Sequence, residues 1–478
     1  MSKPSSPSPH LTRGTITAAV LLVATVAAAS SYQHFAPTAG SQTFEVKSSG
    51  NSPVALSARL DRNRILQGDG GTVRMELTLT GAERASDGPG MPTDLFVVLD
   101  RSGSMTGEKL QRAKAAARGL IAQLSPNDRF SLGSYESGTR MEIPLSNAAH
   151  GAREHWLAVI ARLETASGTT MSAGIDLALD HLVQTRRPYR ATRVVLISDG
   201  QANEGDPSVP GLTRRAQRAA QAEYVLSTVG VGLDFNEQLM TALANVGTGN
   251  FYFVENATGL AEVLHDEFDS ARATIASALS VHLRTPQGVT VRDAAGYMLE
   301  QDGDTTIFRP GSLFAGQQRR VWIEYHIAGE QLGELRLGSV DARYRDRGER
   351  QQVSLAALPA VARVKDRDAY IAGIDRDVWG EGIAVDRFND LRERVSEAVK
   401  RGDKGGAMQA VADYQAEHEE LNEVVQSPAV SKSMRDSVAL EAEIAGAFSG
   451  SGQAEKRNRT AKKLKATGFD GRRAGSKK

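Results

Sequence analysis

Short runs of consecutive apolar residues alternate with segments of helical periodicity in the middle of the chain. The apolar runs have no polar face, which is typical of parallel strands buried on both sides. Between them, apolar residues recur three and four positions apart, as at Ile175, Leu179 and Leu182. This alternation predicts a doubly wound α/β domain over residues 93–270. The expected strands are 95–99, 130–135, 194–197, 225–231 and 251–254.

On both sides of this domain, apolar and polar residues alternate singly, which is the pattern of strands with one buried face. Residues 54–60 and 73–79 alternate before it and predict a hairpin around a glycine-rich turn. The same alternation returns after residue 277. Because two strands cannot bury a core alone, we predict one β-sandwich built from residues 53–90 and 275–365, with the α/β domain inserted in it.

Helical periodicity returns in the carboxyl-terminal part of the chain. Apolar spacings of three and four over 388–399 and 408–425 predict a helical hairpin within residues 366–448, with a shorter third helix at 438–444. Residues 449–478 are rich in Gly, Ser, Lys and Arg and show no apolar periodicity. We therefore expect a disordered basic tail there.

The amino terminus carries the pattern of an export signal. Lys3 and Arg13 precede an apolar run that is followed by small residues, so residues 1–30 read as a signal peptide. The run of about 14 residues is shorter than the roughly 20 needed to span a bilayer, and an uncleaved anchor is the alternative. A linker is expected over 31–52. We predict a periplasmic, cell-surface or secreted protein that contacts the membrane only through such an anchor.

Composition narrows the chemistry that the chain can perform. Basic and acidic residues are balanced at 57 each, so no charge bias toward nucleic acid is present. Cysteine is absent, which excludes thiol nucleophiles, thiolate metal sites and disulfides. The histidines lack a metal-ligand spacing, and neither a nucleophile elbow nor a phosphate-binding loop occurs. Side chains that carry oxygen atoms remain as candidate ligands for a metal ion.

Oxygen-bearing side chains gather where two of the predicted strands end. Strand 95–99 is followed by Asp-Arg-Ser-Gly-Ser, and strand 194–197 is followed by Ser-Asp-Gly. A loop of small residues between them, leading into a helix, offers a further hydroxyl. Open α/β sheets bind ligands at the carboxyl edge, and hard cations such as Mg²⁺ prefer oxygen ligands. The predicted ligands of a divalent ion are Asp100, Ser102, Ser104, Thr169 and Asp199.

The order Asp-x-Ser-x-Ser, then Thr, then Asp resembles the metal-ion-dependent adhesion site of the von Willebrand factor A family. The run Asp-Arg-Ser-Gly-Ser-Met-Thr-Gly-Glu-Lys-Leu is similar to bacterial members and to inter-alpha-trypsin inhibitor heavy chains. The resemblance implies that Ser102, Ser104 and Thr169 contact the ion directly or nearly so, while Asp100 and Asp199 act directly or through water. Mg²⁺ is the expected ion, with Mn²⁺ and Ca²⁺ as alternatives. An Asp or Glu of a protein partner would complete its coordination.

Neighbouring residues carry weaker signals. Integrin β subunits place further acidic residues just after the motif, where this chain has Thr106 and Gly107, so we expect a single metal ion. Glu108 fits a favourable charge in the first turn of a helix. We expect Arg101 to be a surface charge, and the loop with Asn203, Glu204 and Asp206 to be solvated.

The leading hypothesis is a binding protein that performs no catalysis and binds no nucleic acid. A metal-dependent hydrolase, or a chelatase-type subunit partnering an ATPase, is the alternative. The sequence shows no suitably spaced general base for hydrolysis, and the export signal argues against a chelatase. A structural surface component with a degenerate site is a third reading, against which the five intact motif positions stand.

Overall fold

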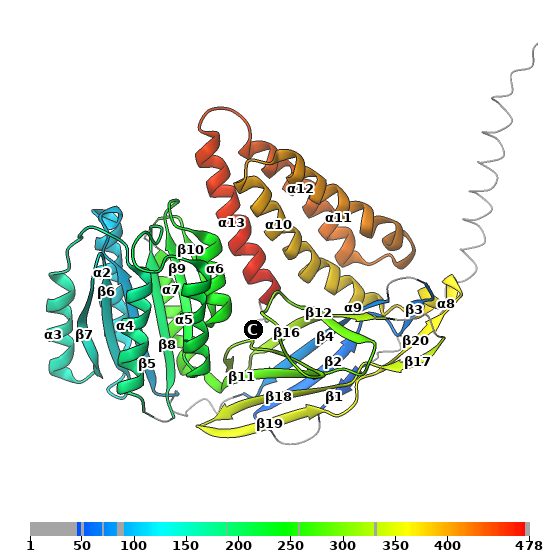
Figure 1. The fold of residues 1–478 in the computed structure, drawn as a ribbon, viewed down its shortest axis with the longest axis horizontal. Helices are drawn as coiled ribbons and strands as arrows, with labels where there is room; N and C mark the ends of the chain where they lie inside the picture. Colours follow the sequence, from blue (N-terminus) through cyan, green and yellow to red (C-terminus); the bar gives the residue numbers. More distant parts are fainter. Residues whose placement is uncertain are drawn as a thin grey trace, which may run out of the picture. The chain divides into compact units, whose positions relative to one another are not determined.

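A six-stranded, mostly parallel sheet forms the α/β domain of the computed structural model (Figure 1). Its strands are β5 (Thr93–Asp100), β6 (Arg129–Tyr135), β7 (Thr139–Asn147), β8 (Ala191–Ser198), β9 (Val225–Val231) and β10 (Thr248–Val254). They lie in the order β10-β9-β8-β5-β6-β7, and only β7 is antiparallel to its neighbour. The fold class predicted from the sequence is confirmed.

The structure describes residues 45–48, 52–68, 71–83, 90–187, 189–256, 259–328 and 332–473.

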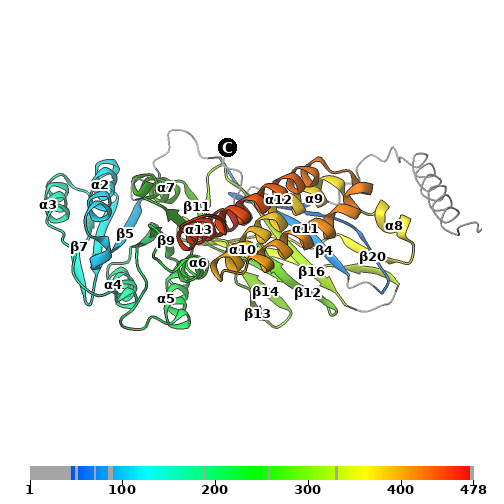
Figure 2. The ribbon, with the colours of Figure 1, turned by 90° about the horizontal axis from the view of Figure 1, so that it is seen from above.

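Helices cover both faces of this sheet (Figure 2). One face carries α2 (Glu108–Gln123), α3 (His150–Ala161) and α7 (Leu260–Arg272), and the other carries α4 (Met171–Gln184), α5 (Val209–Gln221) and α6 (Glu237–Val246). Alternate residues of β5 therefore enter two different cores. Leu95, Val97 and Leu99 pack on one side and Phe96 and Val98 on the other, which explains why the strand is apolar from Leu95 to Leu99.

Two antiparallel sheets form the β-sandwich: the first contains strands from before and after the α/β domain, and the strands of the second all follow that domain in sequence. The first contains β1 (Glu45–Lys47), β2 (Val54–Leu60), β4 (Thr72–Gly81), β16 (Gln318–Ile327) and β12 (Val289–Ala294), in that order. The second runs β13 (Glu300–Asp302), β14 (Thr305–Phe308), β11 (Thr274–Arg284), β18 (Ser339–Asp346) and β19 (Glu349–Leu355), and β15 (Leu313–Phe314) also pairs with β11. A small third sheet joins β17 (Gly333–Arg336), β20 (Ala360–Val364) and β3 (Arg64–Leu66).

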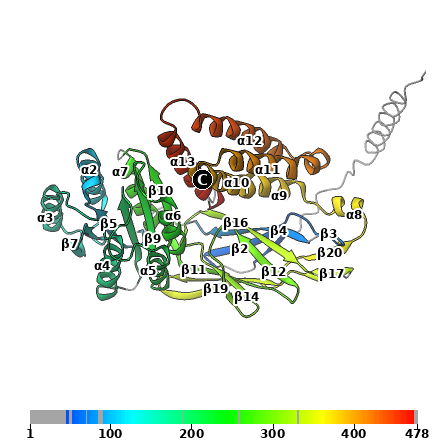
Figure 3. The ribbon, with the colours of Figure 1, turned by 45° about the horizontal axis from the view of Figure 1, so that its top comes forward.

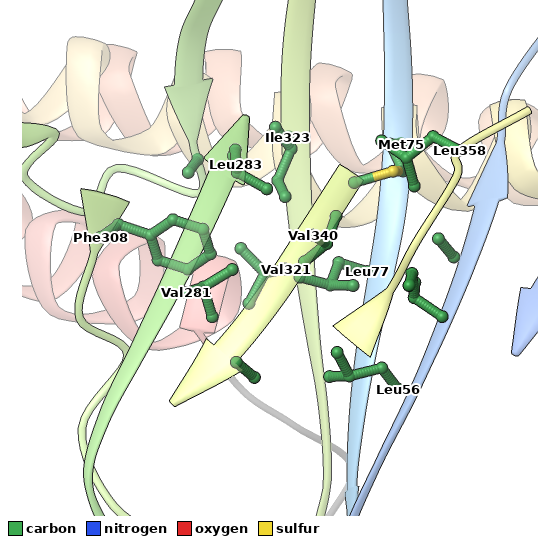
Figure 4. Close-up of a cluster of buried hydrophobic side chains, with 14 of the residues drawn as sticks. Leu56, Met75, Leu77, Val281, Leu283, Phe308, Val321, Ile323, Val340 and Leu358 are labelled. Atoms are coloured by element: carbon green, nitrogen blue, oxygen red, sulfur yellow. The ribbon is translucent and has the colours of Figure 1, made fainter. Parts of the chain in front are cut away.

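The first sheet unites strands that are distant in sequence. β4 pairs with β16 from Thr80 opposite Gln318 to Thr72 opposite His326. Side chains of both sheets share one apolar core, in which Leu77 and Val321 lie near Val281 and Val340 (Figure 4). The chain thus leaves the sandwich after β4 and returns to it at β11, so the α/β domain is an insertion.

The expected linker over 31–52 is wrong in part. Glu45–Lys47 forms β1, which pairs antiparallel with residues Ser57 to Arg59 of β2. A strand of three residues is too short to show a periodicity in the sequence. The predicted signal peptide or anchor at residues 1–30 lies outside the described residues. Among the residues that are described, no helix is long and apolar enough to cross a membrane.

The helical region after the sandwich contains more helix than the sequence predicts. It comprises α8 (Arg367–Ala372), α9 (Arg376–Glu381), the π-helical η3 (Gly382–Arg387), α10 (Phe388–Lys400), α11 (Lys404–Val425) and α12 (Pro428–Ala447). Helices α10, α11 and α12 pack on one another around a common apolar core (Figure 3). The third helix is 20 residues long rather than the short segment expected, because Pro428 begins it at a position that suits proline.

The expectation of a disordered basic tail over 449–478 is wrong for most of its length. Residues Gln453–Arg473 form α13, which packs along α10 and against β10. Leu464 and Phe469 are buried. Lys462 and Lys465 are buried too, because their charges find acidic partners on other elements: Lys462 donates to Glu237 at 2.8 Å, and Lys465 donates to Glu393 at 2.9 Å. Local sequence shows the charges but not these partners.

Phe469 tests whether α13 is an integral part of the fold. Its ring lies 6.4 Å from that of Phe251 on β10 and is 4% exposed, within the core of the α/β domain. We expect Phe469→Ala to lower the free energy of unfolding by about 3–5 kcal/mol, as for other buried aromatic residues. Urea unfolding measures this. Val438→Ala on α12, where the side chain is 58% exposed, should change it by less than about 0.5 kcal/mol.

Candidate metal site

The candidate site begins where β5 ends. Asp100 is the last residue of the strand, a 3₁₀ turn over Gly103–Met105 follows, and α2 starts at Glu108. The backbone N–H of Ser102 donates to Asp100 Oδ1 at 2.8 Å, which folds the loop back over the strand end. Asp100 is fully buried, whereas Ser104 is exposed. The oxygen atoms of the loop therefore extend from the buried carboxylate of Asp100 to the solvent-exposed hydroxyl of Ser104.

Asp199 enters the same site from β8. Because β5 and β8 pair in parallel up to Leu99 opposite Ile197, the residues after both strands emerge at one edge of the sheet. Ser104 Oγ donates to Asp199 Oδ1 at 2.7 Å, and the hydroxyls of Ser102 and Ser104 lie 3.0 Å apart. Two motifs that are distant in sequence are thus joined by direct hydrogen bonds.

Thr169 reaches the site from the loop before α4. Gly200 marks the place: a Cβ atom there would lie 3.6 Å from Ser104 Oγ and 4.0 Å from Thr169 Oγ1. The absence of a side chain at Gly200 leaves the space between these hydroxyls open. All five residues predicted from the sequence are therefore brought to the same edge of the sheet.

Asn203 holds Thr169 in position, a role that the sequence did not reveal. The Thr169 N–H donates to Asn203 Oδ1 at 3.0 Å, and the Asn203 N–H donates to the Thr169 carbonyl at 3.3 Å. In the same loop, Glu204 accepts a hydrogen bond from Thr170 Oγ1 at 3.2 Å. The expected solvated loop thus contributes contacts that position a site residue. In the sequence, the only sign of this role was the position of Asn203 soon after β8.

The Asp100 carboxylate is held in an environment that disfavours its negative charge. Burial raises the pKa of the Asp100 carboxyl, and the charge of Asp199 raises it further. Hydrogen bonds from Ser102 and from Ser198 Oγ, the latter at 2.7 Å, act in the opposite direction on that pKa without cancelling the effect of burial. A bound cation would relieve the repulsion between two carboxylates buried at one edge.

Arg101 is buried, so the prediction of a surface charge is wrong. Its guanidinium donates to Ser134 Oγ at 2.9 Å and to the Glu164 carbonyl at 2.6 Å. It also lies within 3.5 Å of Glu136 and 3.6 Å of Glu142. The side chain therefore ties the β5 loop to β6 and to the segment before Thr169. A variable position inside a motif gave no indication of this burial.

Lys109 is a further charged residue that sequence analysis missed. It lies in the first turn of α2, and its ammonium group donates to Asp199 Oδ2. Glu108 beside it is exposed and pairs with Arg112 at 3.1 Å, as a surface helix charge does. Lysine in an amphipathic helix is ordinarily solvated, so its spacing from the motif carried no signal.

A family model for the von Willebrand factor type A domain matches residues 94–266. This region is a von Willebrand factor type A domain. The family comprises metal-dependent adhesion and protein-interaction modules, as the motif resemblance implied. The match covers the inserted α/β domain and leaves the sandwich and the carboxyl-terminal helices outside it.

Known relatives share this domain at low identity. The uncharacterised protein sll0103 of Synechocystis is 23% identical over 347 residues, which cover 70% of this chain and 81% of that protein. Human inter-alpha-trypsin inhibitor heavy chain H4 is 25% identical over 233 residues, which cover 46% of this chain. The aligned region spans only 24% of the human protein. Both bacterial and heavy-chain relatives predicted from the motif are therefore found.

Two solved structures share the fold over most of the chain. A von Willebrand factor type A protein from Catenulispora acidiphila has a TM-score of 0.61 at 19% identity, covering 79% of this chain and 91% of that one. The ArnB paralog VWA2 from Sulfolobus acidocaldarius has a TM-score of 0.53 at 17% identity, covering 86% and 98%. At these identities the likeness concerns the fold alone.

The residues of this von Willebrand A domain fit a hard divalent cation. Two carboxylates and three hydroxyls supply oxygen ligands of the kind that Mg²⁺ prefers, and Gly200 leaves the space between two of them open. The described residues contain no group of three or more His, Asp or Glu side chains placed to hold a metal. An ion bound here would therefore depend on hydroxyl ligands, as the motif requires.

Asn203 allows a test of whether the Thr169 loop contributes to metal affinity. We expect Asn203→Ala to weaken Mn²⁺ binding about tenfold, because Thr169 loses the hydrogen bond that positions it, worth on the order of 1 kcal/mol. Electron paramagnetic resonance of free Mn²⁺ measures the affinity. Asn203→Asp keeps the acceptor oxygen and should retain most of the binding. Equal loss in both variants would contradict a positioning role.

Proposed function

We propose that this chain is a binding protein whose von Willebrand A domain holds one divalent ion, Mg²⁺ in the first place, and through it binds an Asp or Glu of a protein partner. The observation that carries the proposal is the contact of Ser104 with Asp199 at 2.7 Å. It supports a single site made from two separate motifs. Asp100, Ser102 and Thr169 lie at the same edge of the sheet.

The composition of the site supports a role in binding an external ligand. Mg²⁺ takes octahedral coordination by oxygen and keeps positions for water or ligand when a protein supplies few carboxylates. Neutral hydroxyls leave more positive charge on the ion than carboxylates would. Because Ser104 is exposed, a side chain of another protein can approach the site. A carboxylate is the ligand that this charge and this coordination favour.

The site offers little support for catalysis. Hydrolysis needs a general base near the nucleophile or the metal-bound water. Within the described residues, no histidine is hydrogen-bonded to any of the five candidate ligands. The hydroxyls of Ser102 and Ser104 contact each other, and that of Ser104 donates to Asp199. We therefore propose that the protein is not an enzyme.

Export is the second part of the proposal. It rests on the charged residues Lys3 and Arg13 before an apolar run at the amino terminus. A metal-dependent binding protein outside the cytoplasm would meet partners on the cell surface or in the surrounding medium. Mass spectrometry of the protein isolated from its source would reveal whether the first 30 or so residues are removed or retained as an anchor.

Metal binding is tested with isosteric substitution of the buried carboxylates. We expect wild-type protein to bind Mg²⁺ in calorimetric titration and Asp100→Asn to lose binding at least about a hundredfold, because a buried charge that faces the ion is removed. Glu108→Gln is the matched control, since this exposed carboxylate pairs with Arg112 and not with the site. Equal affinities of wild type and Asp100→Asn would refute the assignment.

Partner binding is tested by affinity capture from extracts of the source organism. Proteins held by the immobilised wild-type chain in Mg²⁺ should be released by a chelator and should not bind Asp199→Ala. We expect these two sets to coincide, because both treatments remove the same ion. Captured proteins that are insensitive to both treatments would point to a different binding surface.

A further inference from the structure

The ammonium group of Lys109 lies at the acidic side of the candidate metal site. It donates to the Asp199 carboxylate, which is fully buried, while the lysine side chain is 29% exposed. A Cβ atom on Gly232, just after β9, would lie 3.6 Å from the Lys109 ammonium nitrogen. The group therefore lies against the backbone at the carboxyl edge of the sheet, where it is paired with Asp199.

Lys109 changes the net charge of the site. Asp100 and Asp199 together carry two negative charges, which a divalent ion alone would neutralise. Among the described residues, Lys109 is the one cation that forms an ion pair with either of them. With the lysine in place, the site without an ion has a single negative charge, and the site with an ion has a single positive charge.

Other charged groups near the site do not cancel this effect. The guanidinium of Arg101 lies within 3.6 Å of two carboxylates, those of Glu136 and Glu142, so it adds no net positive charge beside the site. The carboxylate of Glu204 is bound to Thr170 at 3.2 Å and belongs to an exposed residue, so solvent and salt screen its charge. Lys109 is thus the charge that decides the electrostatic balance around Asp199.

We propose that Lys109 couples the metal ion to the acidic partner. Its positive charge weakens binding of the ion alone, because the ammonium and the ion compete for the negative charge of Asp199. The same charge strengthens binding of a carboxylate to the ion-loaded site, since the carboxylate restores neutrality. The inference rests on the proposed function and adds a regulation to it: the ion and the partner's carboxylate bind cooperatively.

The test compares Mn²⁺ affinity with and without a carboxylate probe. Mn²⁺ is titrated by electron paramagnetic resonance in sodium chloride and in sodium acetate of equal ionic strength. The proteins are wild type, Lys109→Met, Lys109→Gln and Lys109→Arg. Lys109→Met removes the charge and keeps most of the unbranched side chain, Lys109→Gln keeps a hydrogen-bond donor without charge, and Lys109→Arg keeps the charge.

We expect acetate to strengthen Mn²⁺ binding to wild type and to Lys109→Arg. In chloride, Lys109→Met and Lys109→Gln should bind Mn²⁺ about tenfold more tightly than wild type, and acetate should add little. Thermal unfolding of each variant checks that it is folded. If the uncharged variants match wild type in both salts, the coupling role of Lys109 is refuted while the metal site stands. If none of the proteins binds Mn²⁺, the proposed function fails and this inference with it.

Discussion

Parallel pairing of β5 with β8 is the constraint on which the candidate site depends. Adjacent parallel strands end at the same edge of a sheet, so Asp100 and Asp199 are buried near one another although nearly a hundred residues separate them. The apolar cores on both faces hold the two strands in this register. Burial of two carboxylates at one place is unfavourable unless positive charge or hydrogen-bond donors compensate it.

The surrounding residues supply hydrogen-bond donors and one positive charge to these carboxylates. The Ser102 N–H and the hydroxyls of Ser104 and Ser198 donate to the carboxylates, and Lys109 adds a full positive charge on the side of Asp199. The structure thus gathers oxygen atoms and one lysine at the same edge of the sheet.

The carboxyl-terminal helices show how the inserted domain is connected to the rest of the chain. Phe469 of α13 enters the apolar core beside Phe251, and Lys462 forms a buried ion pair with Glu237 at the start of α6. These contacts come from residues more than 200 positions apart in the sequence. The α/β domain is therefore completed by a helix from outside the segment that defines its family.

The sequence by itself determined the class of the fold and the composition of the candidate site. Uninterrupted apolar runs identify strands covered on both faces, and motif spacing selects the five oxygen-bearing residues. The apolar runs and the motif spacing are both local, because each depends on the geometry of a single strand or turn. Only the tertiary structure decided the burial of Arg101, the contact of Lys109 with Asp199 and the formation of a packed helix, α13, near the carboxyl terminus. A charged side chain is solvated or buried according to the partners that other elements bring to it, and those partners are distant in the chain.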